Sequence, residues 1–213
     1  MAEINQVIFW MGGVITQSIP ALLAESFSKA GRSVNVLALP EFEQDTEELI
    51  LGRVDDLTYL KKMGEKAKLA LAPEKFRDVV LATMRPFPGV VDTINLLPAS
   101  YKRWLIVDYP RSWFDQVSGR LGITKCIPGD RRIHLTRSGL PKLMPDVFNY
   151  LIQTIRAPAK QCLIFDLQSR RSSQALNNGI PSAVFVDAER LKREFFLRKF
   201  VSTTYKLHTR PVI

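Results

Sequence analysis

Apolar residues gather into four short runs along the chain. The runs cover residues 6–10 (QVIFW), 103–108 (RWLIVD), 161–166 (QCLIFD) and 182–187 (SAVFVD). Continuous runs of this length, rich in Val, Ile and Phe, are typical of strands that are buried on both faces of a parallel sheet. The pattern predicts a sheet of five or more strands, and these runs supply four of them.

Helical periodicity fills most of the space between the later runs. Apolar positions recur every three or four residues over 112–122, 145–156 and 169–179. Strands that alternate with helices form a parallel sheet through right-handed crossovers, with helices on both faces. We therefore predict an α/β fold, a doubly wound parallel sheet in three layers.

The long segment between the first two runs is different, because it contains no strand pattern. Helical patterns cover residues 20–30, 45–51, 54–68 and 73–84, and the prolines of 85–90 (RPFPGV) mark the return to the sheet. We predict a core domain formed by 1–15 and 86–213 and an inserted helical cap formed by 16–85. Five apolar residues of this segment suit either a homodimer contact or a small core of its own: Leu49, Ile50, Leu57, Tyr59 and Leu60.

Composition is ordinary for a globular protein, with 46% hydrophobic and 24% charged residues. The apolar runs are far shorter than the roughly 20 residues of a membrane span, so no membrane partner is expected. The polar start MAEINQ has no secretory pattern, which favours a cytoplasmic location. The two cysteines and two histidines are scattered, which excludes a zinc cluster built from them.

The net charge of +9 raises the question of nucleic acid. The basic residues are spread along the chain, and the densest group, residues 190–200 (RLKREFFLRKF), has the pattern of an amphipathic helix with a solvated basic face. No nucleic-acid-binding motif accompanies it. We do not expect nucleic acid to be a partner.

Four segments, in order, resemble the motifs of the haloacid dehalogenase-like (HAD) hydrolase superfamily, in its class with a helical cap after the first strand. They are VIFWMGGVIT (7–16), the stretch 87–113 that ends in RWLIVDYPRSW, SGLPKLMPDVFNYLI (138–152) and CLIFDLQSRRSSQALNNGIPSAVF (162–185). The resemblance implies a HAD-like, Rossmannoid core, with Lys142 as the motif lysine and Asp166 as the first aspartate of the fourth motif. It also implies magnesium-dependent phosphatase or dehalogenase chemistry.

Departures from these motifs remove the groups that this chemistry needs. Trp10 stands where the family has its nucleophilic aspartate, and Gly12 stands where the phosphatases have a general acid. Val107 replaces a hydroxyl that donates to the phosphoryl group, and Leu167 replaces the second acidic residue. Only Asp166 and one carbonyl would then remain for Mg²⁺, so we expect no cofactor.

Two interpretations are open at several positions. Trp10 either plugs the vacated pocket, beside the apolar Met11, Val107 and Leu167, or stacks on an aromatic ligand or docks a partner. Lys142 either forms an ion pair with Asp166 or Asp108 or belongs to a retained anion site. Asp108 is expected to cap the next helix or turn, and Arg170 and Arg171, near a helix start, hint at an anionic ligand.

These residues predict a non-catalytic protein that binds an unidentified protein or a small anionic ligand. The predicted ligand-binding residues form the vestigial pocket: Trp10, Gly12, Val107, Asp108, Lys142 and Asp166. The alternative is an active hydrolase that uses Mg²⁺ and a relocated nucleophile, with Asp108, Asp166 or Cys162 as candidates.

Overall fold

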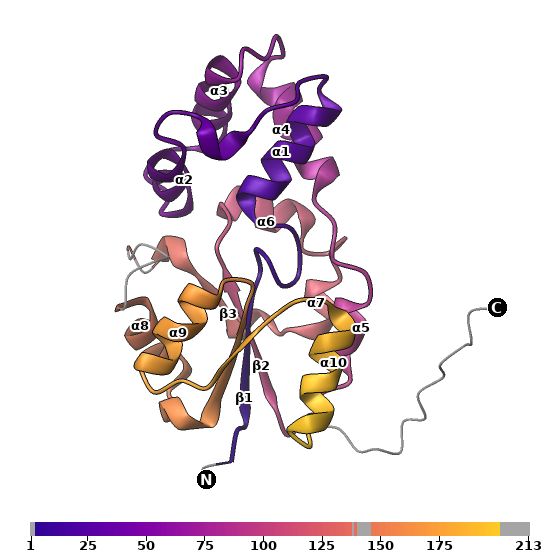
Figure 1. Ribbon diagram of the computed structural model, residues 1–213, viewed down its shortest axis with the longest axis vertical. Coiled ribbons are helices and arrows are strands. Elements are labelled where there is room, and N and C mark those ends of the chain that lie inside the picture. Colours follow the sequence, from indigo (N-terminus) through magenta and orange to yellow (C-terminus); the bar gives the residue numbers. More distant parts are fainter. Residues whose placement is uncertain (1–2, 138, 140–145, 201–213) are drawn as a thin grey trace, which may run out of the picture.

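A sheet of five parallel strands forms the centre of the protein (Figure 1). The computed structural model describes residues 3–137, 139 and 146–200. The strand order is β3-β2-β1-β4-β5. The strands are β1 (Gln6–Trp10), β2 (Lys102–Val107), β3 (Arg132–His134), β4 (Cys162–Asp166) and β5 (Ser182–Val184).

Helices cover both faces of this sheet, which confirms the predicted three-layer α/β fold. Figure 1 shows α8 (Asp146–Ile155) and α9 (Ser169–Asn177) on one side and α5 (Val90–Asn95) and α10 (Ala188–Leu197) on the other. Two further helices, α6 (Arg111–Val117) and α7 (Ile123–Cys126), follow β2. The chain adds β2 and β3 on one side of β1, and β4 and β5 on its other side, so the strand order reverses between β1 and β4. Ligands of open α/β sheets bind beyond the strand ends at such a point.

The two central strands are buried along their whole length, as their apolar runs predict. All five residues of β1 and all five of β4 are buried. The two strands pair in register from Gln6 with Cys162 to Phe9 with Phe165, and the rings of Phe9 and Phe165 stack with their centroids 5.6 Å apart. The next residues along each strand are Trp10 and Asp166, so the register brings them to the same edge of the sheet.

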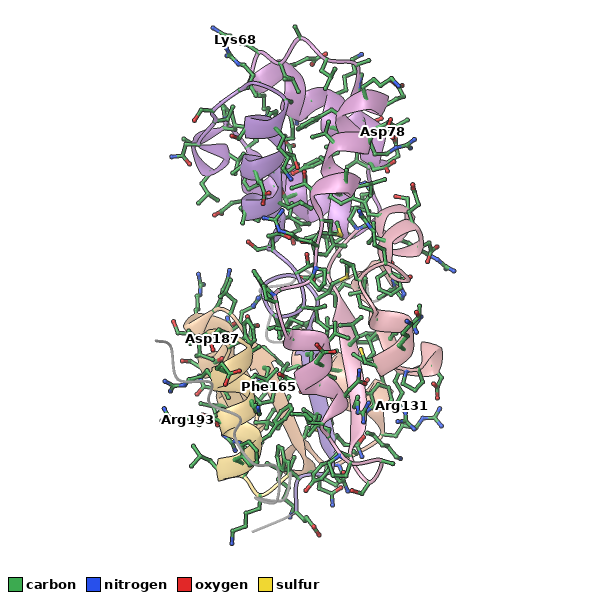
Figure 2. The ribbon with its side chains drawn as sticks, turned by 90° about the vertical axis from the view of Figure 1, so that its right-hand side faces the viewer. Lys68, Asp78, Arg131, Phe165, Asp187 and Arg193 are labelled. Carbon is green, nitrogen blue, oxygen red and sulfur yellow. The ribbon has the colours of Figure 1, made fainter. Side chains whose placement is uncertain are left out.

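Five α-helices and one short 3-10 helix lie between β1 and β2, and all of them except α5 form a separate lobe above the sheet (Figure 1 and Figure 2). Its elements are α1 (Ile19–Lys29), η1 (Val36–Ala38), α2 (Phe42–Ile50), α3 (Asp56–Lys66) and α4 (Pro73–Thr83). The lobe has apolar contacts of its own, such as the rings of Phe27 and Phe76 at 4.6 Å.

The residues that suggested a homodimer contact lie mostly inside this lobe. Leu49, Ile50, Tyr59 and Leu60 are buried, and Leu57 is half-buried. Of the two interpretations, the structure shows the small core within the lobe. Self-association of the protein remains a prediction, and these residues present no exposed face that would support it.

Two strand-like connections join the lobe to the sheet, and they bond to each other. The hydroxyl of Thr16 donates to the carbonyl of Arg85 at 2.7 Å, and the N–H of Phe87 donates to the carbonyl of Ile15 at 2.8 Å. A third contact lies farther out, where Asp56 of α3 accepts bonds from the Trp113 indole at 3.0 Å and the Ser112 hydroxyl at 3.2 Å. Side-chain bonds therefore fix the lobe to α6 as well as to the connections.

The sequence pattern missed one strand and overran one helix. β3 has only three residues, two of them charged or polar, and it pairs with β2 at an edge of the sheet, where an apolar run is not required. The helix predicted over 112–122 ends at Val117, and a turn leads into α7. Within the described ranges, the longest and most apolar helix falls short of what a membrane crossing needs.

Candidate functional site

The carboxyl end of β1 carries a large buried side chain. Trp10 is fully buried, and the chain turns directly after it. Within this turn the N–H of Gly13 donates to the carbonyl of Thr16 at 2.7 Å. The neighbouring Met11 and Val107 are fully buried as well, so an apolar layer closes this part of the sheet edge.

Two glycines allow this turn to pack against the neighbouring strand ends. A Cβ on Gly12 would lie 2.8 Å from Oδ2 of Asp108, and a Cβ on Gly13 would lie 2.8 Å from Cβ of Leu167. Gly13 also has a φ of 98°, in the region that favours glycine. The position of the family's general acid is therefore closed to a side chain.

Asp108 bonds across the sheet edge instead of capping a helix, which corrects the sequence prediction. Its Oδ1 accepts the N–H of Gly12 at 2.8 Å, from 96 residues away in the chain. The next helix begins at Arg111 after Pro110, with no side-chain cap. The reason is that a buried N–H among apolar neighbours needs an acceptor, and the Asp108 carboxylate, itself buried, is adjacent.

A buried arginine joins the ends of β1 and β4. Arg171, in the first turn of α9, is 2% exposed, and its Nη2 lies 2.5 Å from Oδ1 of Asp166, which is 1% exposed. The same oxygen accepts the N–H of Gln168 at 2.9 Å. The guanidinium carbon lies 4.5 Å from the centre of the Trp10 ring, a cation–π distance. Arg171 therefore lies between an indole and a carboxylate.

From the sequence, Arg170 and Arg171 together only hint at an anionic ligand, and the internal partner of Arg171 was not predicted. A cation in the first turn of a helix is unfavourable unless an anion compensates it. Asp166, which ends the preceding strand, is that anion. An arginine placed five residues after a strand-end aspartate was the available signal. Lys142, the expected partner, lies outside the described residues.

Two further predictions change with the structure. Leu167, expected among the apolar neighbours of a plugging Trp10, is 43% exposed and lines the pocket between the helical lobe and the strand ends. Cys162, a candidate nucleophile, starts β4 and so lies at the opposite edge of the sheet from Trp10. Burial raises the pKa of its thiol to about 11, which keeps it protonated.

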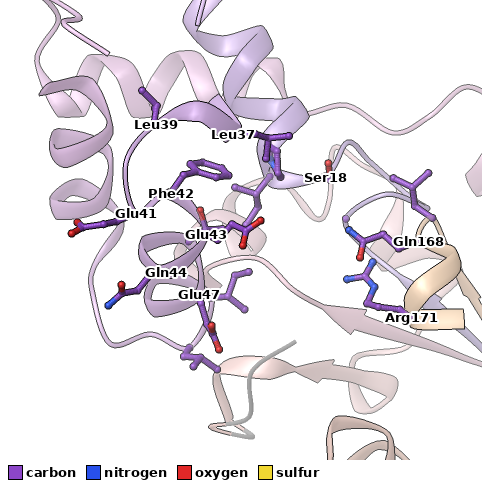
Figure 3. Close-up of a pocket in the computed structure, with 17 residues that line it drawn as sticks. Ser18, Leu37, Leu39, Glu41, Phe42, Glu43, Gln44, Glu47, Gln168 and Arg171 are labelled. Atoms are coloured by element: carbon purple, nitrogen blue, oxygen red, sulfur yellow. The ribbon is translucent and has the colours of Figure 1, made fainter. Parts of the chain in front are cut away.

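A pocket of about 690 Å³ lies between the helical lobe and these strand ends (Figure 3). Residues of α1, η1 and α2 line it on the lobe side, and Gly12, Leu167, Gln168 and Arg171 line it on the core side. Of the predicted ligand-binding residues that the structure describes, Gly12 lines this pocket. Trp10, Val107, Asp108 and Asp166 lie beneath it and are buried.

The residues present do not fit the magnesium ion that the family resemblance implies. Trp10 offers no oxygen at the end of β1, and a guanidinium already neutralises Asp166 at the end of β4. Within the described ranges, no three His, Cys, Asp or Glu side chains are grouped as metal ligands would be. Mg²⁺ requires near-octahedral oxygen ligands, and this donor set cannot supply its protein share.

No protein-family profile matches the sequence, and the search of curated proteins found no match. Solved structures do match. A HAD family enzyme from Bacteroides thetaiotaomicron is 12% identical, with a TM-score of 0.74 over 91% of this chain and 99% of that one. A predicted HAD-like family hydrolase from Porphyromonas gingivalis is 15% identical, with a TM-score of 0.70 over 92% and 98%.

An L-2-haloacid dehalogenase from Xanthobacter autotrophicus, with chloropropionic acid covalently bound, is 18% identical. Its TM-score is 0.65 over 94% of this chain and 91% of that one. At these sequence identities the likeness establishes the fold alone, and the chemistry of this protein has to be inferred from the residues of its own site. The protein therefore has the fold of the HAD-family enzymes, which confirms the resemblance stated from sequence at the level of the fold.

Proposed function

We propose that this protein is a HAD-fold binding protein without hydrolase activity, which takes a ligand or partner in the pocket between lobe and sheet. The observation that carries the proposal is the stack of Trp10, Arg171 and Asp166. A cation–π contact and an ion pair fill the place where the fold's enzymes hold their reacting carboxylate. The division into a core of 1–15 and 86–213, a cap of 16–85 and a cytoplasmic location are parts of this proposal.

Among the described residues, each position that the hydrolytic reaction needs either lacks the required side chain or holds one that is already bonded. The Trp10 indole is neither a nucleophile for phosphorus or carbon nor a proton carrier. Asp108 accepts a buried N–H, and Gly12 leaves no room for an acid. Asp166 accepts bonds from a guanidinium and a backbone N–H. A carboxylate held in this way is a weaker nucleophile, because attack would break a buried ion pair.

The experiment is a hydrolysis assay on the full chain with Mg²⁺. para-Nitrophenyl phosphate and 2-chloropropionate represent the two chemistries of the fold's enzymes. The expected result is release no faster than in buffer, since loss of the nucleophile leaves only the rate that binding provides. The alternative of a relocated nucleophile would be established by turnover that is lost in Asp166→Asn or in Asp108→Asn. A mock purification, which should show no turnover, is the control.

A further inference from the structure

The pocket presents charges of opposite sign on its two walls (Figure 3). Glu43 and Glu47, four residues apart and so on one face of α2, lie on the lobe wall. Gln168 and Arg171 lie opposite them on the core wall. This arrangement sets the charge of any ligand that spans the pocket.

The two walls differ in how their charges are compensated. Within the part of the chain that the structure describes, no ion pair involves Glu43 or Glu47, whereas Glu41 on the same wall lies 3.4 Å from Lys62 and 3.5 Å from Lys66. On the core wall, Asp166 neutralises Arg171. The described residues therefore leave the pocket with a net negative charge, which disfavours a phosphate or carboxylate ligand.

The core wall also carries buried hydrogen-bond donors that have no acceptor in the described part of the chain. Nε and Nη1 of the 98% buried Arg171 have no hydrogen-bond partner among the described residues. Buried donors of this kind are normally hydrogen-bonded, and each donor that is left without an acceptor costs stability. A neutral oxygen of a ligand, presented at this wall, would supply the missing acceptor without adding negative charge.

Apolar surface between the charged groups completes the pattern. Leu37 of η1 is 63% exposed and Leu167 is 43% exposed, and both line the pocket together with the ring of Phe42. Large apolar side chains left in water on two walls of one cavity are typical of a ligand site. An apolar ligand body would remove them from water.

We infer that the pocket binds a small amphipathic cation. Its ammonium or guanidinium group lies at Glu43 and Glu47, its apolar body lies against Leu37 and Leu167, and a neutral oxygen faces Arg171. The inference rests on the proposed binding function and reverses the ligand charge that the sequence motifs imply. It names a ligand class and no particular compound.

The probe is phenylalanyl-leucinamide, which carries one ammonium group, two apolar side chains and neutral carbonyl oxygens. Its N-acetyl form has the same body without the charge. Calorimetric titration of the full chain should show binding of the amine at millimolar concentration or below and about tenfold weaker binding of the acetylated form. Equal binding of both forms, or no binding of the amine at millimolar concentration, would overturn the inference.

Matched variants locate the binding. Glu43→Gln with Glu47→Gln should weaken the amine about tenfold. Glu48→Gln with Glu65→Gln changes the lobe charge equally outside the pocket and should leave binding within twofold. Leu37→Ser should weaken both forms, whereas Leu197→Ser, 70% exposed on α10, should weaken neither. Equal loss in the glutamate pair and its control would overturn the assignment.

Inorganic phosphate separates this inference from the proposed function. One solved structure of the Bacteroides thetaiotaomicron enzyme is a complex with magnesium and inorganic phosphate. Here phosphate should neither bind nor displace the amine. Phosphate that binds without turnover would overturn the cation assignment and leave the non-catalytic proposal standing, whereas hydrolysis would overturn the proposal itself.

Discussion

The core wall and the lobe wall of the pocket differ in where their charges find partners. On the core wall, Asp166 and Arg171 pair with each other, and Asp108 bonds to Gly12, so the charges beneath the surface have partners within the core. Two donors of Arg171, Nε and Nη1, still have no acceptor among the described residues. On the lobe wall, Glu43 and Glu47 face the pocket without an ion pair among the described residues. Under the proposed function, the strand ends serve stability and the lobe wall serves recognition.

The largest effect should follow from removing the ring at the end of β1. Trp10→Ala empties a fully buried site and takes away the surface on which Arg171 lies. The expected loss is about 3–5 kcal/mol of unfolding free energy, measured by denaturant titration. Trp10→Phe, which keeps an aromatic face, should lose clearly less unfolding free energy than Trp10→Ala. A loss below about 0.5 kcal/mol for Trp10→Ala would contradict the burial of the ring.

Removing the guanidinium should cost nearly as much. Arg171→Ala removes one buried charge partner of Asp166, and the expected loss is about 3 kcal/mol in the same titration. Arg170→Ala, the exposed neighbour on the same helix, is the control and should change stability by less than about 0.5 kcal/mol. Equal effects of the two variants would show that the pair with Asp166 does not stabilise the fold.

A smaller effect is expected where the turn meets β2. Gly12→Ala places a Cβ within 2.8 Å of Asp108, so the carboxylate must move or lose its bond to the turn. We expect a loss of about 2 kcal/mol in melting experiments. Gly119→Ala has nothing within 4 Å of the new Cβ and serves as the control. If Gly12→Ala were as mild as Gly119→Ala, the close packing of these strand ends would be disproved.

The smallest effect concerns the lobe alone. Burial raises the pKa of Asp45, but hydrogen bonds from Lys62 and Lys66 outweigh it and hold the pKa below its usual value. A carboxyl with a lowered pKa in the folded state adds stability at neutral pH, and this part is lost as the pH falls below about 4.

Asp45→Asn should therefore cost about 1 kcal/mol at pH 7 and progressively less in acid. Unfolding curves measured from pH 7 to pH 3 check the trend. A difference between Asp45→Asn and the unchanged protein that stays constant with pH would contradict it.

The sheet was predictable because burial leaves a strong trace in the sequence. The strands β1 and β4, buried on both faces, require continuous apolar runs, and those runs place Trp10 and Asp166 at neighbouring strand ends. The edge strand β3 makes no such demand, so its three residues carry no signal. The helices of the lobe follow from their periodicity, with boundaries shifted by a few residues.

The contacts at the strand ends were only partly predictable. The absence of a carboxylate at the end of β1 follows from the single position of Trp10, but the bond from Gly12 to Asp108 joins residues 96 apart and depends on strand order. The ion pair predicted between Lys142 and Asp166 or Asp108 lies outside the described residues and stays a prediction, whereas the ion pair of Asp166 with Arg171 was not predicted. Leu167 faces the pocket because the chain turns after β4, which no local pattern records.

The most direct test of the account is whether any carboxylate of this chain becomes a covalent ester. The fold's dehalogenase holds chloropropionic acid covalently. Intact-mass spectrometry of the full chain, after incubation with 2-chloropropionate or with acetyl phosphate and Mg²⁺, followed by peptide mapping, would detect such an ester. The account predicts an unchanged mass under both conditions. An adduct mapped to Asp108 or Asp166 would contradict it and identify a working nucleophile beneath the pocket.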